Sequence, residues 1–138
     1  MKYGIITPTF IEHFCFIEKY LESFDKYVTD KENVKIIFTI SKDELNAFNK
    51  IVKKYRKIDY DIILFEDLLK KYNINYSSEE LLAKYGKFTF QTMKKFYSML
   101  ESDCEKFLVL DSESMWIRKT SMVQLFEDFF KSPFISIS

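Results

Sequence analysis

The chain has 138 residues, the length of one ordinary globular domain, so we expect residues 1–138 to form a single domain. Its 21 basic and 21 acidic residues cancel, which excludes the global positive field that recruits nucleic acid or an anionic membrane surface. Only 2 glycines and 2 prolines argue against a loop-rich β-sandwich and against a disordered chain.

Two kinds of apolar pattern alternate along the chain. Short runs of consecutive apolar residues predict strands, and apolar residues spaced by three and four predict helices. In chain order, the predicted elements are a strand at 3–7, a helix at 11–24, a strand at 34–40, a helix at 42–56, a strand at 60–65, helices at 68–72, 79–85 and 88–102, a strand at 106–110, a turn or short strand at 115–117, a helix at 121–130 and a last apolar run at 134–137. This alternation is typical of βαβ units, so the expected fold class is α/β, with a mainly parallel, Rossmann-like sheet flanked by helices.

Local signals refine three of these elements. Ser41 followed three residues later by Glu44 predicts a capping box at the start of a helix, and Gly86 suits a helix end or a sharp turn. The helix at 88–102 is expected to bury one apolar side, made of Phe88, Met93, Phe96, Tyr97 and Leu100.

The strand expected at 106–110 stops at two acids that are separated by one serine. In an extended chain, side chains at positions i and i+2 lie on the same face, so Asp111 and Glu113 should converge, with Ser112 turned away. Like charges this close are unfavourable unless one is protonated or a cation lies between them, and a hard divalent ion takes carboxylate and phosphate oxygens. The simpler interpretation is a solvated turn after a strand.

Ligands of parallel sheets bind beyond the carboxyl ends of the strands. The predicted topology brings four loop segments to that edge, and these are 7–9, 39–41, 65–67 and 111–113.

Four side chains outside the acidic pair have expected places in the fold. Gln91 and Lys94 are three residues apart on a predicted helix and can share a face. His13 has no second histidine or cysteine near it and is expected on a helix surface, whereas Trp116 is expected in the core.

The expected compartment follows from the cysteines and from the hydropathy. Cys15 and Cys104 have neither a zinc-binding spacing nor a disulfide framework, so we expect two buried thiols in a reducing compartment. The apolar run at the N-terminus is too short for a signal peptide, and no later run approaches the ~18 apolar residues that span a membrane. We expect a cytoplasmic protein without a transmembrane segment.

Residues 88–118 resemble the central block of the GT-A-fold nucleotide-sugar glycosyltransferases. The resemblance rests on Phe90–Tyr97 (FQTMKKFY) and on Phe107–Arg118 (FLVLDSESMWIR), and it extends as strand order alone over residues 3–65. It is closest to bacterial polysaccharide-related members, in which a helix with glutamine and lysine precedes a strand ending in LDSD. The chain therefore looks like the N-terminal, donor-binding half of such an enzyme, with a DxD-like DSE motif.

The resemblance implies a sheet of the nucleotide-diphospho-sugar transferase type and transfer of a sugar from a nucleotide-sugar donor to a sugar or glycan acceptor in bacterial surface polysaccharide or glycoconjugate synthesis. By position, Asp111 and Glu113 match the DxD motif, which holds Mn²⁺ or Mg²⁺ against the donor diphosphate. The candidate donor-binding residues are Thr7, Pro8, Thr9, Ser41, Gln91, Lys94, Asp111, Ser112 and Glu113.

GT-A enzymes continue beyond this motif with an acceptor-binding half, and the present chain has only a short tail there. We therefore expect a donor half whose acceptor half is missing, or a homo-oligomer. The alternative function is a non-catalytic or truncated module that binds a nucleotide sugar or serves assembly, and fold alone does not separate the two.

Overall fold

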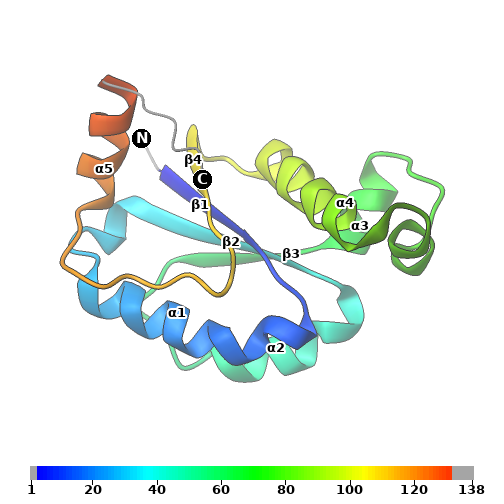
Figure 1. Ribbon diagram of the computed structural model, residues 1–138, viewed down its shortest axis with the longest axis horizontal. Helices are drawn as coiled ribbons and strands as arrows, with labels where there is room; N and C mark the ends of the chain where they lie inside the picture. Colours follow the sequence, from blue (N-terminus) through cyan, green and yellow to red (C-terminus); the bar gives the residue numbers. More distant parts are fainter. Residues whose placement is uncertain (1–2, 132–138) are drawn as a thin grey trace.

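A sheet of four parallel strands forms the centre of the computed structural model, which describes residues 3–131 (Figure 1). The strands are β1 (Tyr3–Pro8), β2 (Val34–Ile40), β3 (Tyr60–Leu64) and β4 (Lys106–Val109). Their order is β3-β2-β1-β4, and every pairing between neighbours is parallel. The predicted α/β class with a parallel sheet is confirmed.

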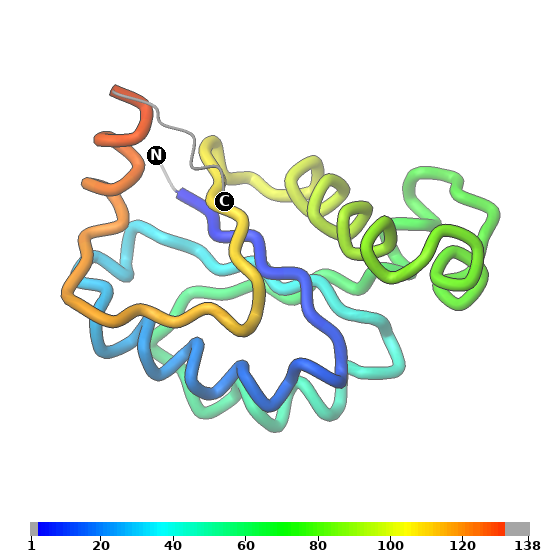
Figure 2. Tube along the Cα trace, viewed as in Figure 1, coloured from blue at the N-terminus to red at the C-terminus, as the bar shows by residue number. Residues whose placement is uncertain are grey.

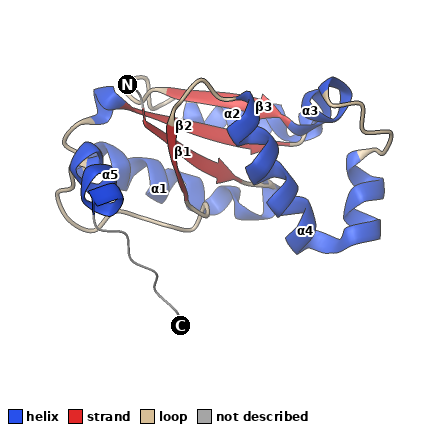
Figure 3. Cartoon of the chain, turned by 90° about the horizontal axis from the view of Figure 1, so that it is seen from above, coloured by secondary structure: helices blue, strands red, loops and turns tan. Residues whose placement is uncertain are grey.

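Helices cover both faces of the sheet. They are α1 (Phe14–Tyr27), α2 (Leu45–Val52), α3 (Phe65–Lys71), α4 (Ser78–Glu101) and α5 (Met122–Lys131), with short 3₁₀ turns η1 (Ile11–His13), η2 (Lys31–Asn33) and η3 (Lys42–Glu44). Figures 1 and 3 show α1 and α2 on one face and α3 and α4 on the other. The tube in Figure 2 shows the segment after β4 running back along α1 to reach α5.

The alternation of side chains along each strand divides the core between the two faces. Ile5, Ile36 and Phe38 pack toward α1 and α2, and the ring of Phe38 lies 5.0 Å from that of Phe48 on α2. Ile6 and Ile37 pack on the opposite face, together with Cys104. Strands buried on both faces account for the uninterrupted apolar runs from which they were predicted.

Helix α4 joins the two helices expected at 79–85 and 88–102 across a kink at Gly86. Gly86 has φ 82° and ψ 170°, a conformation that is almost restricted to glycine. A Cβ atom there would meet no heavy atom within 4 Å, so the backbone angle and not the available space requires glycine.

The predicted apolar side of α4 was wrong in part, since Met93 and Tyr97 pack partly buried against the core but three other residues do not. Phe88, Phe96 and Leu100 are 85%, 63% and 67% exposed. The side that faces the sheet instead carries the buried residues Leu81, Phe90, Lys94 and Ser98. Lys94 and Ser98 can be buried there because they hydrogen-bond to oxygens of the loop after β1 and of β2.

Other expectations were met in part. The capping box at Ser41 is confirmed, and Trp116 packs edge-on against two rings of α1. Residue Phe65 begins α3 instead of ending β3. Cys104 is buried, whereas Cys15 is exposed.

The segment predicted as a turn or short strand at 115–117 has no regular structure, and the apolar run at 134–137 lies outside the described residues. Among the helices that the structure describes, none combines the length and the apolar character needed to cross a membrane.

The carboxylate of Asp30 fixes the start of α5. It accepts hydrogen bonds from Met122 N (2.8 Å), Val123 N (2.9 Å) and Ser121 Oγ (3.0 Å). Burial by itself would raise the pKa of Asp30, but the hydrogen bonds outweigh it, and the pKa is lowered.

We expect Asp30→Asn to destabilise the fold by about 1 kcal/mol at pH 7, because the amide can accept fewer of these bonds. A carboxyl group whose pKa is lowered in the folded state stabilises the fold at pH values above 3.8, its pKa in the unfolded chain. This stabilisation is lost as the pH falls through the lower pKa of the folded state. The difference in urea-unfolding free energy between the two proteins should therefore shrink in acid. The control is Asp128→Asn, on the exposed surface of α5; an equal loss in both variants would contradict the assignment.

Candidate functional site

Two adjoining cavities lie at the carboxyl ends of the strands. The large cavity has a volume of about 410 Å³ and the small cavity about 290 Å³. Phe10, Lys87 and Gln91 line both, so these three side chains form the boundary between them.

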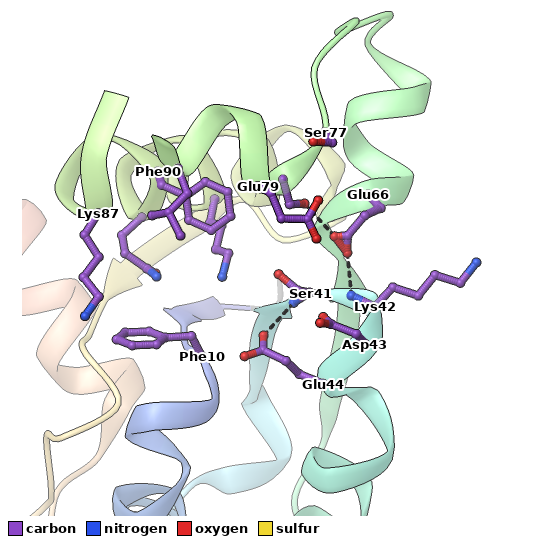
Figure 4. A pocket seen from close by; sticks show the side chains of 14 residues that line it. Phe10, Ser41, Lys42, Asp43, Glu44, Glu66, Ser77, Glu79, Lys87 and Phe90 are labelled. Carbon is purple, nitrogen blue, oxygen red and sulfur yellow. Dashed lines mark hydrogen bonds between the residues drawn. The ribbon is translucent and has the colours of Figure 1, made fainter. Parts of the chain in front are cut away.

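The large cavity is walled by the segment after β2, by the start of α3 and by both limbs of α4 (Figure 4). The kink at Gly86 brings Ser78 and Glu79 of the first limb to the same cavity as Gln91 and Lys94 of the second. Charged side chains are half of the residues that line the cavity, and Phe10, Phe90 and Leu82 give it apolar surface.

Two glutamates of the large cavity are already used by the fold. Glu44 accepts hydrogen bonds from Ser41 N (3.1 Å) and Ile11 N (2.7 Å). Glu66 accepts from Lys42 N (2.5 Å) and Ser78 Oγ (2.8 Å). These carboxylates therefore tie the loop after β1, the loop after β2 and the start of α4 together.

Two other acids of the same cavity, Asp43 and Glu79, are exposed. Neither side chain makes a hydrogen bond or an ion pair with another of residues 3–131. Their oxygens are available to accept hydrogen bonds from hydroxyl or amino groups of a ligand.

Lys94 is the buried cation of the large cavity. Its side chain is 0% exposed, its Nζ donates to the carbonyl oxygen of Thr9 over 3.1 Å, and it lies 4.8 Å from the centre of the Phe90 ring. Burial lowers the pKa of Lys94 to about 8, against the opposing effect of Glu44, Glu66 and Asp43.

The acidic pair lies at the small cavity. Asp111 and Glu113 are exposed and line it together, and Ser112 between them also lines it but is buried. The expected extended chain is wrong here: Ser114 N donates to the carbonyl oxygen of Asp111 over 3.0 Å, so the acids lie in a turn that follows the strand, as the simpler interpretation had it. The hydroxyl of Ser112 has no hydrogen-bond partner among the described residues. Lys95 Nζ is 3.8 Å from Asp111 Oδ1.

The donor set of the small cavity suits a hard divalent ion. Two carboxylates supply the oxygen ligands that Mg²⁺ and Mn²⁺ prefer, and such ions usually complete their shell with water and substrate phosphates. Among residues 3–131, no group of three or more His, Cys, Asp or Glu side chains is close enough to hold a metal. A bound ion would therefore need further ligands from water or from its substrate.

The structure distributes the remaining predicted site residues over three places. Ser41 lines the large cavity and Pro8 the small one. Thr7 and Thr9 are buried beneath the cavities, where the hydroxyl of Thr7 bonds to that of Tyr20 (2.5 Å).

Sequence reasoning did not single out Phe10 or Asp43, which line the cavities. Phe10 comes two residues after the end of β1 and Asp43 three residues after the end of β2, and this closeness to strand ends was the available signal. His13, expected on a helix surface, is half-buried and lines the small cavity, with its ring 4.2 Å from that of Phe10.

Solved glycosyltransferase structures share this fold. S. aureus TarS gives a TM-score of 0.60 at 20% identity, with 95% of this chain and 20% of that chain covered. A TarS fragment in complex with UDP-GlcNAc gives 0.59 at 19% identity, with 95% and 32% covered. Mouse xyloside xylosyltransferase 1 in its apo form gives 0.58 at 15% identity, with 95% and 49% covered.

The chain thus has a glycosyltransferase fold and spans half or less of the length of these proteins. No protein-family model matches it, and neither does any curated protein.

The lowered pKa of Lys94 predicts a dependence of stability on pH. Between about 8 and 10.5 the unfolded chain binds a proton that the folded protein does not, so the folded state gains stability as the pH rises through this window. Replacement by methionine removes this gain. The unfolding free energy of the wild type relative to Lys94→Met should rise with pH by on the order of 3 kcal/mol, measured by urea unfolding from pH 7 to pH 10.5.

The matched control is Lys95→Met, because Lys95 is the next residue on α4 and is only partly buried. A difference that stays constant with pH for Lys94→Met would show that Lys94 titrates normally.

Proposed function

We propose that residues 1–138 form the nucleotide-sugar-binding unit of a metal-dependent glycosyltransferase that acts in bacterial surface polysaccharide or glycoconjugate synthesis. The observation that carries the proposal is the juxtaposition of Asp111 and Glu113 with a second, larger cavity across Phe10, Lys87 and Gln91. The glycosyltransferase fold supports it, since ligands of such sheets bind at this edge.

In the proposed arrangement, the nucleoside occupies the large cavity and the diphosphate and sugar extend into the small one. The ring of Phe10 offers a face on which a base can stack, and the free carboxylate of Asp43 accepts hydrogen bonds from ribose hydroxyls. A complex of TarS with UDP-GlcNAc supports a uridine nucleotide as the first donor to test.

The charges of the small cavity suit transfer of a sugar away from a diphosphate. Asp111 and Glu113 would hold Mn²⁺ or Mg²⁺, which when bound supplies positive charge to the leaving nucleoside diphosphate. Lys87 and Lys95 add local cations beside the same cavity, and Gln91 can donate to a phosphate or sugar oxygen from the boundary.

A second candidate function is a binding or assembly module that takes the nucleotide sugar without transferring the sugar. The fold that the chain shares with these structures does not by itself separate the two functions. Hydrolysis of the donor sugar, or its transfer to an added glycan, separates the two functions, because only the enzyme releases UDP.

The central test is thermal unfolding with UDP and Mn²⁺ together. A ligand that binds only the folded state at 100 times its Kd stabilises it by about 2.7 kcal/mol, so we expect the melting temperature to rise by about 5 °C or more. The rise should require both the nucleotide and the metal, and the variant Asp111→Ala/Glu113→Ala should lose it.

Asp103→Ala is the matched control, because Asp103 precedes β4 and lies at the opposite end of that strand from Asp111. The Asp103→Ala variant should show the full rise in melting temperature with UDP and Mn²⁺. An unchanged melting temperature with UDP, with other nucleoside diphosphates and with either metal would refute nucleotide binding by this chain.

A further inference from the structure

Phe10 lines both cavities and lies at the boundary between them. It lies in the short segment between β1 and η1, and its ring contacts His13 at 4.2 Å and the ammonium of Lys87 at 5.0 Å. Figure 4 shows the ring below the end of the Lys87 side chain and pointing away from Glu44. Small changes in its direction alter the width of both cavities.

The peptide groups on the two sides of Phe10 are each held by a charged side chain. The carbonyl oxygen of Thr9, before it, accepts a hydrogen bond from Lys94 Nζ over 3.1 Å. The N–H of Ile11, after it, donates to Glu44 Oε2 over 2.7 Å. Because the backbone has only two soft dihedral angles per residue, fixing both flanking peptide planes fixes the Cα–Cβ direction of Phe10.

The two anchors are buried and carry opposite charges. Lys94 is 0% exposed and Glu44 is 9% exposed, and they come from α4 and η3, on different walls of the large cavity. Buried charges are costly unless they are paired and hydrogen-bonded, and the negative charge of Glu44 acts favourably on Lys94. Each side chain therefore holds its own peptide group, since moving it away would leave a buried charge without that hydrogen bond.

We propose that Lys94 and Glu44 are positioning residues that clamp the backbone around Phe10 and so set the direction of its ring for the donor. This assigns Lys94 a role through the Thr9–Phe10 peptide and not through direct contact with the ligand. The role of the ring toward a nucleotide rests on the proposed function, whereas the clamp itself does not.

The first test observes the ring without ligand. A single 4-fluorophenylalanine is incorporated at position 10 of the full chain, and the ¹⁹F spectrum is recorded for the otherwise unchanged protein, for Lys94→Met and for Glu44→Gln. The clamp predicts one narrow line in the parent and a broadened or multiple line in each variant. Glu44→Gln nearly preserves size and shape, so it tests the clamp even if Lys94→Met does not fold.

Glu66→Gln is the matched control for this spectrum. Glu66 also accepts two hydrogen bonds at the large cavity, but its donors, Lys42 N and Ser78 Oγ, do not flank Phe10. The ¹⁹F line of the Glu66→Gln variant should remain single and narrow. Narrow single lines in Lys94→Met and Glu44→Gln would overturn the clamp, as would equal broadening in all three variants.

The second test measures UDP affinity in Mn²⁺ by calorimetry in a double-mutant cycle. Phe10→Ala should weaken binding by about tenfold, and Lys94→Met by about threefold to tenfold. If Lys94 acts through Phe10, adding Lys94→Met to Phe10→Ala weakens binding no further.

Multiplicative losses in the double variant would assign Lys94 a contact with the ligand and overturn the positioning role. If the wild type fails to bind UDP or any other nucleoside diphosphate, the proposed function is refuted, and the ¹⁹F spectra still decide whether the clamp exists.

Discussion

The parallel pairing of β1 with both β2 and β4 is the constraint on which the site depends. Pro8 is in register with Thr39, and Ile6 is in register with Val109, so the segments that follow these strands leave the sheet at one edge. A shift of one residue in either pairing would exchange the side chains that pack on the two faces of the sheet, such as Ile5 and Ile6, and the different cores on these faces oppose such a shift. The acidic pair, the loop after β1 and the capping box after β2 therefore reach the same pair of cavities.

Above this edge, polar contacts join the segments that form the walls of the cavities. Glu44, Glu66 and Lys94 each bind a backbone group of a neighbouring segment, and Ser98 bonds to Thr39 on β2. Such contacts contribute modestly to net stability, but an unsatisfied partner is costly, so they define one arrangement of the walls. A nucleotide sugar, whose groups are mostly polar, needs walls with fixed hydrogen-bonding directions.

Local patterns predicted the elements well and the faces of the helices unevenly. The strand bounds agree to within a residue, because runs of β-branched and aromatic residues between turn residues have few other interpretations. Helix α4 was the exception. Lys94 was expected on a donor-facing side with Gln91, yet it is buried and bonds to Thr9, and Ser98 is buried against Thr39; both partners are distant in sequence. No periodicity reveals such partners, and none pointed to Phe10 or Asp43.

The sequence by itself determined the α/β class, the four strands and the presence of two acids that flank a serine after the last of them. These features depend on local propensity and on the period of apolar residues, and both are set by residues that are close together in the sequence. Only the tertiary structure decided that the acids share a cavity with Phe10 and Lys87, that Gly86 bends α4 around a second cavity, and that a buried lysine and a buried glutamate meet the peptide groups on either side of one phenylalanine. Those contacts join residues far apart in the chain, and folding alone brings them within bonding distance.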